Sequence, residues 1–219
     1  MKEDWSIKEG STITHRGKAS RLVERFTPSS ITTPHLLDVG SGNGFFIDTL
    51  PLRFAVDAVD GKNFLSEQAR TRVGSFVAQD LNSAWLFQDR VYDAVTLWNV
   101  LEHLENPFHF AREAARVLKD GGILFVSIPN VFNLRSRLQF LFSGEMPRYH
   151  HNNSHLTPFT HTTLQKIFTS FTPVASGFWG YEFPFRSKHF RIPFTKRFLK
   201  HSKLFGQTAY FIFQKPKPL

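Results

Sequence analysis

The chain has 219 residues, contains no cysteine, and carries 27 Lys and Arg against 18 Asp and Glu, which gives a formal net charge of +9. The missing cysteines exclude disulfide frameworks and thiolate metal sites and suit a reducing cytoplasmic compartment. The length fits one α/β domain, and no apolar run reaches the roughly 18 residues that a membrane-spanning helix needs. We therefore expect a cytoplasmic protein folded as a single domain over residues 1–219.

The first predicted strand runs into a glycine-rich loop. Residues 36–46 read Leu-Leu-Asp-Val-Gly-Ser-Gly-Asn-Gly-Phe-Phe, so an apolar run ends in Asp38. The glycines that follow at alternate positions are Gly40, Gly42 and Gly44. Such a loop brings backbone N–H groups close to a ligand, because glycine has no Cβ. A dinucleotide-binding loop would need a small residue where Phe45 stands, so a nicotinamide cofactor fits poorly. A tight strand-to-helix turn without a ligand is the structural alternative.

The second predicted strand, residues 54–60, ends in Asp60 and is followed by Gly61. Asp60 lies 22 positions after Asp38, near the offset of about 20 residues at which an acidic side chain meets a nucleotide ribose. A carboxylate suits this task because it can accept from both vicinal hydroxyls. Asp57 is the competing candidate, but it lies inside the strand. A solvated aspartate without a ligand is the structural alternative for both residues.

Two more predicted strands also end in polar residues. Residues 75–82 indicate a short strand that ends in Asp80. Residues 92–98 form an apolar run typical of a buried strand, and Asn99 follows it. The carboxyl ends of parallel strands meet at one edge of a sheet, where ligands of such folds bind. We therefore expect one crevice to gather these side chains with those of the first two strands.

A helix and a further strand come next. Residues 108–118 carry apolar side chains at helical spacing, and the Lys-Asp-Gly-Gly sequence at 119–122 is a strong helix stop. Residues 123–128 are a continuous apolar strand that Pro129 closes. The alternation of strand and helix patterns from residue 36 onward favours a parallel sheet covered by helices on both faces.

The ordered motifs resemble class I S-adenosyl-L-methionine (SAM) dependent methyltransferases. The Asp-x-Gly-x-Gly-x-Gly spacing matches the first motif of this family. Leu101-Glu-His-Leu104 before Pro107 resembles the stretch after its fourth strand, and the segments 116–122 and 128–130 resemble a later signature. The resemblance covers about residues 30–170 and includes ubiquinone-biosynthesis and related bacterial small-molecule O-methyltransferases.

This resemblance implies SAM as the cofactor and S-adenosyl-L-homocysteine as its product. In the family an acidic residue after the third strand accepts the adenine amino group and the next residue covers the ring, which points to Asp80 and Leu81. The residues expected at the cofactor are Asp38, Gly40, Ser41, Gly42, Gly44, Asp60, Gly61, Asp80, Leu81 and Asn99.

The family fold is Rossmann-like α/β. It is a doubly wound, mostly parallel seven-stranded sheet with helices on both faces and an antiparallel last strand. Residues 173–179 and 208–213 are the candidates for the last two strands. Within the single domain we expect an N-terminal lid segment over residues 1–30, with a leading helix from Ile13 to Phe26. Residues 131–170 are expected to cap the substrate pocket, and residues 183–207 to form a basic, aromatic insertion.

Two histidines are the candidate catalytic residues. His155 lies just before a Phe-Thr helix start, in a region that often caps the substrate pocket in the family. His103 follows the fourth strand and is the second candidate. A neutral imidazole at either place could take the proton from an acceptor hydroxyl, since its pKa lies near working pH. The structural alternative is that His155 braces the helix at Thr160 and that His103 holds its loop.

The histidine-rich run at residues 150–155 is also a candidate metal site. His150, His151 and His155 lie close together in sequence, but Glu145 is the one carboxylate near them and no cysteine accompanies them. We therefore expect no metal.

The surplus positive charge lies at the C-terminal end. No acidic residue follows Glu182, and phenylalanines alternate with the basic residues there. These basic residues are Arg186, Lys188, Arg191, Lys196, Arg197, Lys200, Lys203, Lys215 and Lys217. Pro193 to Phe205 predicts a short amphipathic helix. Residues 186–205 are either an ordinary insertion packed on the sheet or a peripheral contact with an anionic inner membrane surface. Nucleic acid is disfavoured as a partner, because no separate RNA-binding module is visible.

The function expected from these features is SAM-dependent methyl transfer to a small-molecule acceptor. The acceptor is expected to be a hydroxyl of a sugar, lipid-linked or quinone-type precursor. An NAD-dependent Rossmann oxidoreductase and a non-catalytic SAM-binding or interaction protein of the same fold are the alternatives. Intact acidic and glycine positions at the expected cofactor site argue against a degenerate, non-binding site.

Overall fold

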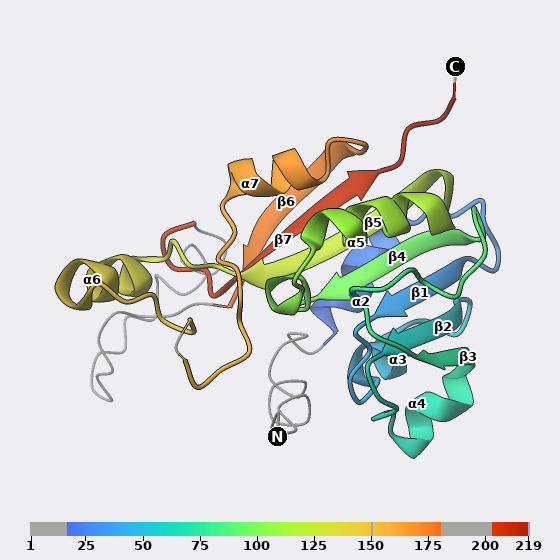
Figure 1. Cartoon of the computed structure of the whole chain (residues 1–219). Coiled ribbons are helices and arrows are strands. Elements are labelled where there is room, and N and C mark those ends of the chain that lie inside the picture. The colour runs from blue at the N-terminus through green and yellow to red at the C-terminus, as the bar shows by residue number, and fades with distance from the viewer. Residues whose placement is uncertain (1–16, 150, 181–202, 219) are drawn as a thin grey trace, which may run out of the picture.

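The computed structural model describes residues 17–149, 151–180 and 203–218. A seven-stranded sheet lies at its centre, with helices on both faces (Figure 1). The strands are β1 (His35–Val39), β2 (Ala55–Asp60), β3 (Val73–Ala78), β4 (Tyr92–Trp98), β5 (Leu118–Pro129), β6 (Thr172–Trp179) and β7 (Thr208–Gln214). The helices are α2 (Lys18–Phe26), α3 (Phe45–Thr49), α4 (Glu67–Arg72), the 3₁₀ turn η1 (Leu101–His103), α5 (Pro107–Val117), α6 (Leu134–Ser143) and α7 (His161–Ile167).

The strand order is β3-β2-β1-β4-β5-β7-β6. Strands β1 to β5 run parallel to one another, and β7 runs antiparallel to both of its neighbours, β5 and β6. This arrangement confirms the predicted fold class, including the antiparallel last strand. It also brings the carboxyl ends of β1 to β5 to one edge of the sheet, where the candidate cofactor residues were expected.

Alternate residues of the central strands enter two hydrophobic cores. On β1, Leu37 and Val39 face the core formed with α5 and α7, whereas Leu36 faces the core formed with α2, α3 and α4. Every residue of β4 is buried. Because both faces of these strands are covered, their sequences read as continuous apolar runs.

The helix starts follow local sequence signals. Four helices begin at a side chain that accepts a backbone N–H from the first turn, which satisfies one of the otherwise unpaired donors. The capping residues are Ser66 for α4, Asn106 for α5, Asn133 for α6 and Thr160 for α7. Pro107 at the start of α5 adds a fixed φ where no N–H is needed.

The structure shifts some predicted element bounds. Strand β5 begins at Leu118, so the segment 119–122 that was expected to end a helix starts a strand instead. The reason is pairing with the chain after β7, since Gly121 donates to the Lys215 carbonyl and Lys215 donates to the Gly122 carbonyl. Strand β3 ends at Ala78, so Asp80 lies beyond it in the following loop.

Parts of two predicted segments lie outside the described residues. These are residues 1–16 of the expected lid and residues 183–202 of the expected basic insertion. Of the described residues, 203–205 at the end of the insertion form a turn. Within the described ranges, no helix is both long and apolar enough to cross a membrane.

Candidate cofactor site and acceptor crevice

The three glycines after β1 are required for different physical reasons. A Cβ on Gly40 would lie 2.3 Å from a methyl carbon of Val100, and one on Gly44 would lie 2.3 Å from the Ala69 Cβ on α4. These two glycines therefore allow close packing between segments. Gly42 has φ +51° and nothing within 4 Å of its Cβ position. It opens a space that a ligand can occupy.

Ser41 adds an observation that points to a ligand at this loop. Its side chain is 8 % exposed, and its buried Oγ has no hydrogen-bond partner among the described residues. Buried hydroxyls in folded proteins are almost always hydrogen-bonded. A polar ligand atom lying over Gly42 would supply the missing partner, so the loop has both the room and the chemistry for a small molecule.

Asp60 at the end of β2 reaches across to the glycine loop. Its Oδ2 accepts from the backbone N–H of Gly42 at 2.8 Å, and its Oδ1 accepts from Gly61 at 2.7 Å. Burial raises the pKa of Asp60, and the backbone N–H groups of Gly42, Gly61 and Lys62 partly offset this. Each carboxylate oxygen has a second lone pair, so both oxygens can also accept from ligand hydroxyls.

Asp57, the competing candidate, has a different setting. Its Oδ2 accepts from the Tyr92 hydroxyl at 2.8 Å and lies 3.0 Å from the His35 Nε2. Its Oδ1 accepts from the backbone N–H of Ser75 at 2.9 Å. The pKa of Asp57 is lowered overall, although burial raises it, because hydrogen bonds from His35, Tyr92 and Ser75 favour the ionised form. Asp57 therefore links β2 to β1, β3 and β4 through its contacts with His35, Ser75 and Tyr92.

Asp38 is buried under the glycine loop and is 2 % exposed. Its Oδ1 accepts a 2.6 Å hydrogen bond from the Thr96 hydroxyl on β4. Burial raises the pKa of Asp38 to about 7, the Thr96 hydrogen bond lowers it, and the charge of Asp60 raises it again. Two carboxylates thus lie near each other at the loop, an arrangement that a cationic ligand would stabilise.

The adenine-side candidates lie in the loop after β3. Asp80 accepts from the backbone N–H of Asn82 at 2.9 Å, and Leu81 is 8 % exposed within the core. Asn82, which the sequence analysis missed, also accepts from the backbone N–H groups of Glu105 and Asn106 at 2.9 and 3.3 Å. Asn82 therefore joins this loop to the segment after η1.

Asn99 ends β4 in a left-handed conformation with φ 52°. Its backbone N–H lies 3.1 Å from the Ser127 Oγ, and the Ser127 hydroxyl donates to the Asn99 Oδ1 at 3.2 Å. Non-glycine residues adopt this conformation uncommonly, and they cluster at functional sites. The sequence predicted Asn99 at the crevice, but its partner on β5 could not be read from the sequence.

The two candidate catalytic histidines lie against each other. The ring centroids of His103 and His155 are 4.6 Å apart, although the residues come from η1 and from the loop before α7. The Glu102 carbonyl accepts from the backbone N–H groups of Leu156 and Thr157 at 2.7 and 3.3 Å. These bonds hold the second segment against the first.

Glu102 is the residue that sequence reasoning missed at this place. Its side chain is fully buried, and its carboxylate and one nitrogen of each of His103 and His155 lie within 4.8 Å of one another. Tyr149 packs against His155 with ring centroids 5.3 Å apart. The pKa of Tyr149 is raised by burial and further by the negative charge of Glu102.

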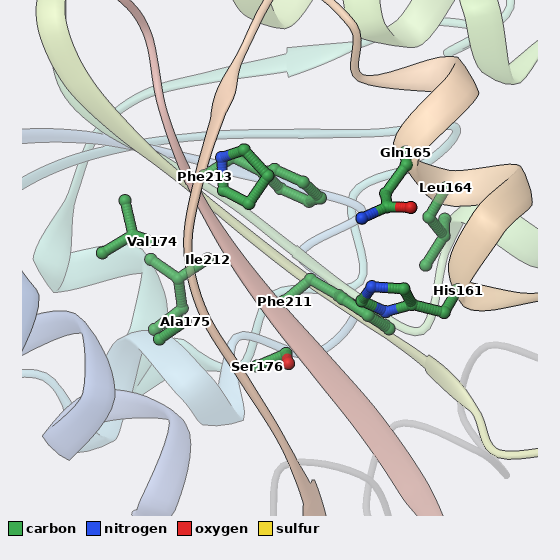
Figure 2. A pocket seen from close by; sticks show the side chains of 10 residues that line it. His161, Leu164, Gln165, Val174, Ala175, Ser176, Phe211, Ile212 and Phe213 are labelled. Carbon is green, nitrogen blue, oxygen red and sulfur yellow. The ribbon is translucent and has the colours of Figure 1, made fainter.

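Two adjoining cavities lie between α7 and the last strands. The first is about 220 Å³, and Figure 2 shows His161, Leu164 and Gln165 reaching from α7 toward the residues of β6 and β7. The second is about 310 Å³ and begins at the carboxyl end of β5. Its lining residues are Ile128, Pro129, Asn130, Phe132, Phe159, His161, Ser176, Gly177, Phe178, Lys203, Ala209 and Phe211. It is mostly apolar and aromatic, and Lys203 and His161 are its basic residues.

Comparison with known proteins agrees with this architecture. A family model described as "Methyltransferase domain" matches residues 13–171. The chain is 33 % identical over 118 residues to a probable S-adenosylmethionine-dependent methyltransferase of Mycobacterium tuberculosis, a match that covers 53 % of this chain and 41 % of that protein. It is 32 % identical over 105 residues to a ubiquinone biosynthesis O-methyltransferase of Caulobacter vibrioides, covering 43 % and 40 % of the two chains. The chain thus spans less than half the length of these relatives.

A solved structure extends the likeness of the fold over nearly the whole chain. It comes from the complex between the Haloferax volcanii Trm112 methyltransferase activator and the putative methyltransferase, with a TM-score of 0.64. The match covers 98 % of this chain and 96 % of that one at 16 % sequence identity. At this identity the likeness concerns the fold alone.

Proposed function

The chain belongs to the methyltransferase domain family, and we propose on this premise that it transfers a methyl group from SAM to a hydroxyl of a small-molecule acceptor. The observation that carries the proposal is the glycine loop with Asp60. Gly42 leaves an open space, Asp60 borders it at hydrogen-bond distance, and the buried Ser41 hydroxyl lacks a protein partner among the described residues.

The charge of this site supports a cationic cofactor. SAM carries a sulfonium and an ammonium group, and the negative charge of Asp60 contributes, after burial, to the raised pKa of Asp38. A nearby positive charge would favour the ionised forms. In the proposed complex the Asp60 carboxylate accepts from the ribose hydroxyls, and Asp80 and Leu81 lie on the adenine side.

The protein's own contribution to the reaction is chiefly alignment. SAM supplies an electrophilic methyl group whose leaving thioether needs no proton. The protein must therefore hold the acceptor oxygen in line with the methyl carbon and exclude water, and such positioning alone gives large rate gains. We further propose that His103 and His155, which lie after β4 and before α7, act on the acceptor hydroxyl.

The cavity at the end of β5 is proposed to receive the acceptor. Its aromatic lining, which includes Phe132, Phe159 and Phe178, favours an apolar or aromatic molecule over a bare sugar. Of the expected acceptors, a quinone-type phenol or a lipid-linked precursor therefore suits it best. Lys203 at the same cavity would favour an acceptor that also carries a negative group.

Contact with an anionic membrane is proposed for the C-terminal basic segment, residues 186–205, most of which lies outside the described residues. Helix α6, which is described, adds support. Phe140, Leu141 and Phe142 are 51 %, 73 % and 84 % exposed, and Figure 1 shows α6 projecting from the rest of the fold. Apolar side chains beside basic residues are typical of segments that lie in a membrane interface.

A thermal-shift screen with SAM, S-adenosyl-L-homocysteine, NAD⁺ and NADP⁺ tests the cofactor assignment. Ligands that bind the folded state raise its melting temperature. We expect the first two compounds to stabilise the protein and the nicotinamide cofactors to leave it unchanged. The opposite pattern would favour the oxidoreductase alternative, to which the family match gives no support.

A further inference from the structure

We infer that Ser127 on β5 is a positioning residue for the cofactor. Its hydroxyl fixes Asn99 so that the Asn99 amide group donates to the carboxylate of the SAM amino-acid portion. Ser127 is 1 % exposed, and the sequence analysis did not single it out. The identity of the ligand rests on the proposed function, whereas the contact between the two residues does not.

Ser127 and Asn99 are joined through backbone and side-chain atoms. The Asn99 backbone N–H lies 3.0 Å from the Ser127 carbonyl oxygen and 3.1 Å from the Ser127 Oγ. The Ser127 Oγ also lies 3.2 Å from the Asn99 Oδ1. An amide oxygen can only accept, so the hydroxyl donates its one proton to Oδ1 and accepts from the backbone N–H. Both functions of this buried hydroxyl, donor and acceptor, are therefore directed at Asn99.

These bonds hold Asn99 in a conformation that it would otherwise adopt only rarely. Its φ of 52° is left-handed, and asparagine tolerates this region better than most residues. Such conformations persist where the surrounding structure determines them. Without the Ser127 hydroxyl, the Asn99 side chain would lose the bond that fixes its rotation.

The bond to Ser127 also decides which end of the Asn99 amide remains for a ligand. Because Oδ1 is bound on the β5 side, the opposite end of the planar amide, the Nδ2 amino group, is left over. This half-buried side chain makes no hydrogen bond through Nδ2 within the described part of the chain. An amino group of an amide can only donate, so the ligand atom that meets it must be an acceptor.

The strand order indicates which part of SAM reaches Asn99. Neighbouring strands follow one another as β3-β2-β1-β4, and the residues proposed for the adenine and the ribose are Asp80 after β3 and Asp60 at the end of β2. In SAM the ribose lies between the adenine and the amino-acid portion. The amino-acid portion therefore extends over the loop after β1 toward β4. Gly40 in that loop closely approaches Val100, the neighbour of Asn99.

Charge selects the carboxylate within the amino-acid portion. Asp38 and Asp60 would attract the ammonium group of SAM and repel its carboxylate, so the carboxylate needs donors that carry no negative charge. The Asn99 amino group is such a donor. A hydrogen bond to an ionised acceptor is roughly twice as strong as one between neutral groups, which makes its alignment by Ser127 matter for affinity.

Calorimetric titration of the full chain with S-adenosyl-L-homocysteine measures the coupling between the two residues. Asn99→Gly removes the amide and tolerates the left-handed backbone, and Ser127→Ala removes the hydroxyl. We expect at least about 10-fold weaker binding in Asn99→Gly and at least about 3-fold in Ser127→Ala. The double variant should bind no more weakly than Asn99→Gly, because Ser127 acts through Asn99.

Ser20→Ala is the matched control for the loss of a buried serine hydroxyl. Ser20 on α2 is 5 % exposed, and its hydroxyl donates to the Gly17 carbonyl at 3.0 Å. This variant and Ser127→Ala should both melt at a lower temperature than wild type. Only Ser127→Ala should bind S-adenosyl-L-homocysteine more weakly.

Asn99→Asp tests the carboxylate assignment separately. Aspartate keeps an oxygen that can accept from Ser127 and replaces the amino group by a second, negatively charged oxygen. It should repel the ligand carboxylate and weaken binding of S-adenosyl-L-homocysteine at least about 10-fold. Circular dichroism checks the fold of every variant, and Asn99→Asp keeps the test decisive if Ser127→Ala does not fold.

Losses that multiply in the double variant would overturn the inference, because independent residues act additively in free energy. Wild-type affinity in folded Ser127→Ala or in Asn99→Asp would overturn it as well. A protein that binds S-adenosyl-L-homocysteine in this way retains the proposed function and loses only the role of Ser127. A wild type that does not bind this ligand at all would overturn the proposed function and the inference together.

Discussion

Asp60 accepts a 2.8 Å hydrogen bond from the backbone N–H of Gly42. This bond joins the end of β2 to the loop after β1, so a ligand that lies over Gly42 also meets the Asp60 carboxylate. The open space and the acceptor group therefore belong to one site, and a change at either residue should act on the same ligand.

Replacing Gly42 by Val should abolish SAM binding in a protein that still folds. The new side chain would enter the open space. The backbone φ of +51° at position 42 is also unfavourable for a β-branched residue. Gly144→Val is a matched control, because Gly144 has φ +71° with nothing within 4 Å of its Cβ position and lies at the end of α6. Calorimetry should show lost affinity in the first variant only. Unchanged affinity in folded Gly42→Val would refute the assignment of the loop.

Asp60→Ala should weaken SAM and S-adenosyl-L-homocysteine binding alike, because both carry the same ribose. The expected loss is about 1.5–3 kcal/mol, which is typical of hydrogen bonds to a charged group. Asp57→Ala should instead lower the melting temperature with little change in affinity, since Asp57 accepts from Tyr92 and Ser75. Calorimetry and thermal melts of both variants decide between them. A large loss of affinity in Asp57→Ala alone would assign ribose binding to Asp57 instead of Asp60.

Asp38→Asn should stabilise the protein at pH 8 and have little effect near pH 4. The pKa of Asp38 is about 7 in the folded state against an ordinary value of 3.8. The folded state therefore binds a proton that the unfolded state has released, and this stabilising contribution is lost as the pH rises through about 7. Asparagine mimics the protonated form at every pH.

Melting temperatures of the wild type and of Asp38→Asn between pH 4 and pH 8 measure how the stability difference between them depends on pH. Asp57→Asn is the control with the opposite sign, because the pKa of Asp57 is lowered and its ionised form stabilises the fold above its unfolded pKa. If the difference between wild type and Asp38→Asn did not change with pH, Asp38 would not hold its proton in the folded state.

The protein should sediment with vesicles that contain phosphatidylglycerol, more strongly at low salt. Each basic residue near an anionic bilayer contributes about 1 kcal/mol of attraction, and insertion of Phe140 and Phe142 would add a salt-resistant part. The Phe140→Ser/Phe142→Ser variant should lose that part. Leu52→Ser is the control, because Leu52 is 84 % exposed like Phe142 but lies before β2. A protein that stays in the supernatant under all conditions contradicts the proposal, and binding to single-stranded RNA at physiological salt would favour the nucleic-acid alternative.

The sequence was sufficient to predict the sheet and the edge of it at which the candidate cofactor residues end their strands, because both depend on short-range patterns. Apolar runs marked β1, β2, β4 and β5, and Asp60 followed from a fixed offset within a strand–helix–strand unit. The sequence did not predict that Glu102 joins His103 and His155. That cluster depends on a loop some fifty residues away docking on η1 through backbone bonds, and no local periodicity reports which carboxylate becomes buried.

A crystal structure of the protein with S-adenosyl-L-homocysteine tests the central claim most directly. The proposed site predicts ribose hydroxyls at hydrogen-bond distance from the Asp60 carboxylate, with the amino-acid portion of the ligand over Gly42 and a polar ligand atom on the Ser41 hydroxyl. A ligand bound elsewhere on the protein, or one that makes no contact with Asp60 and the glycine loop, would contradict it.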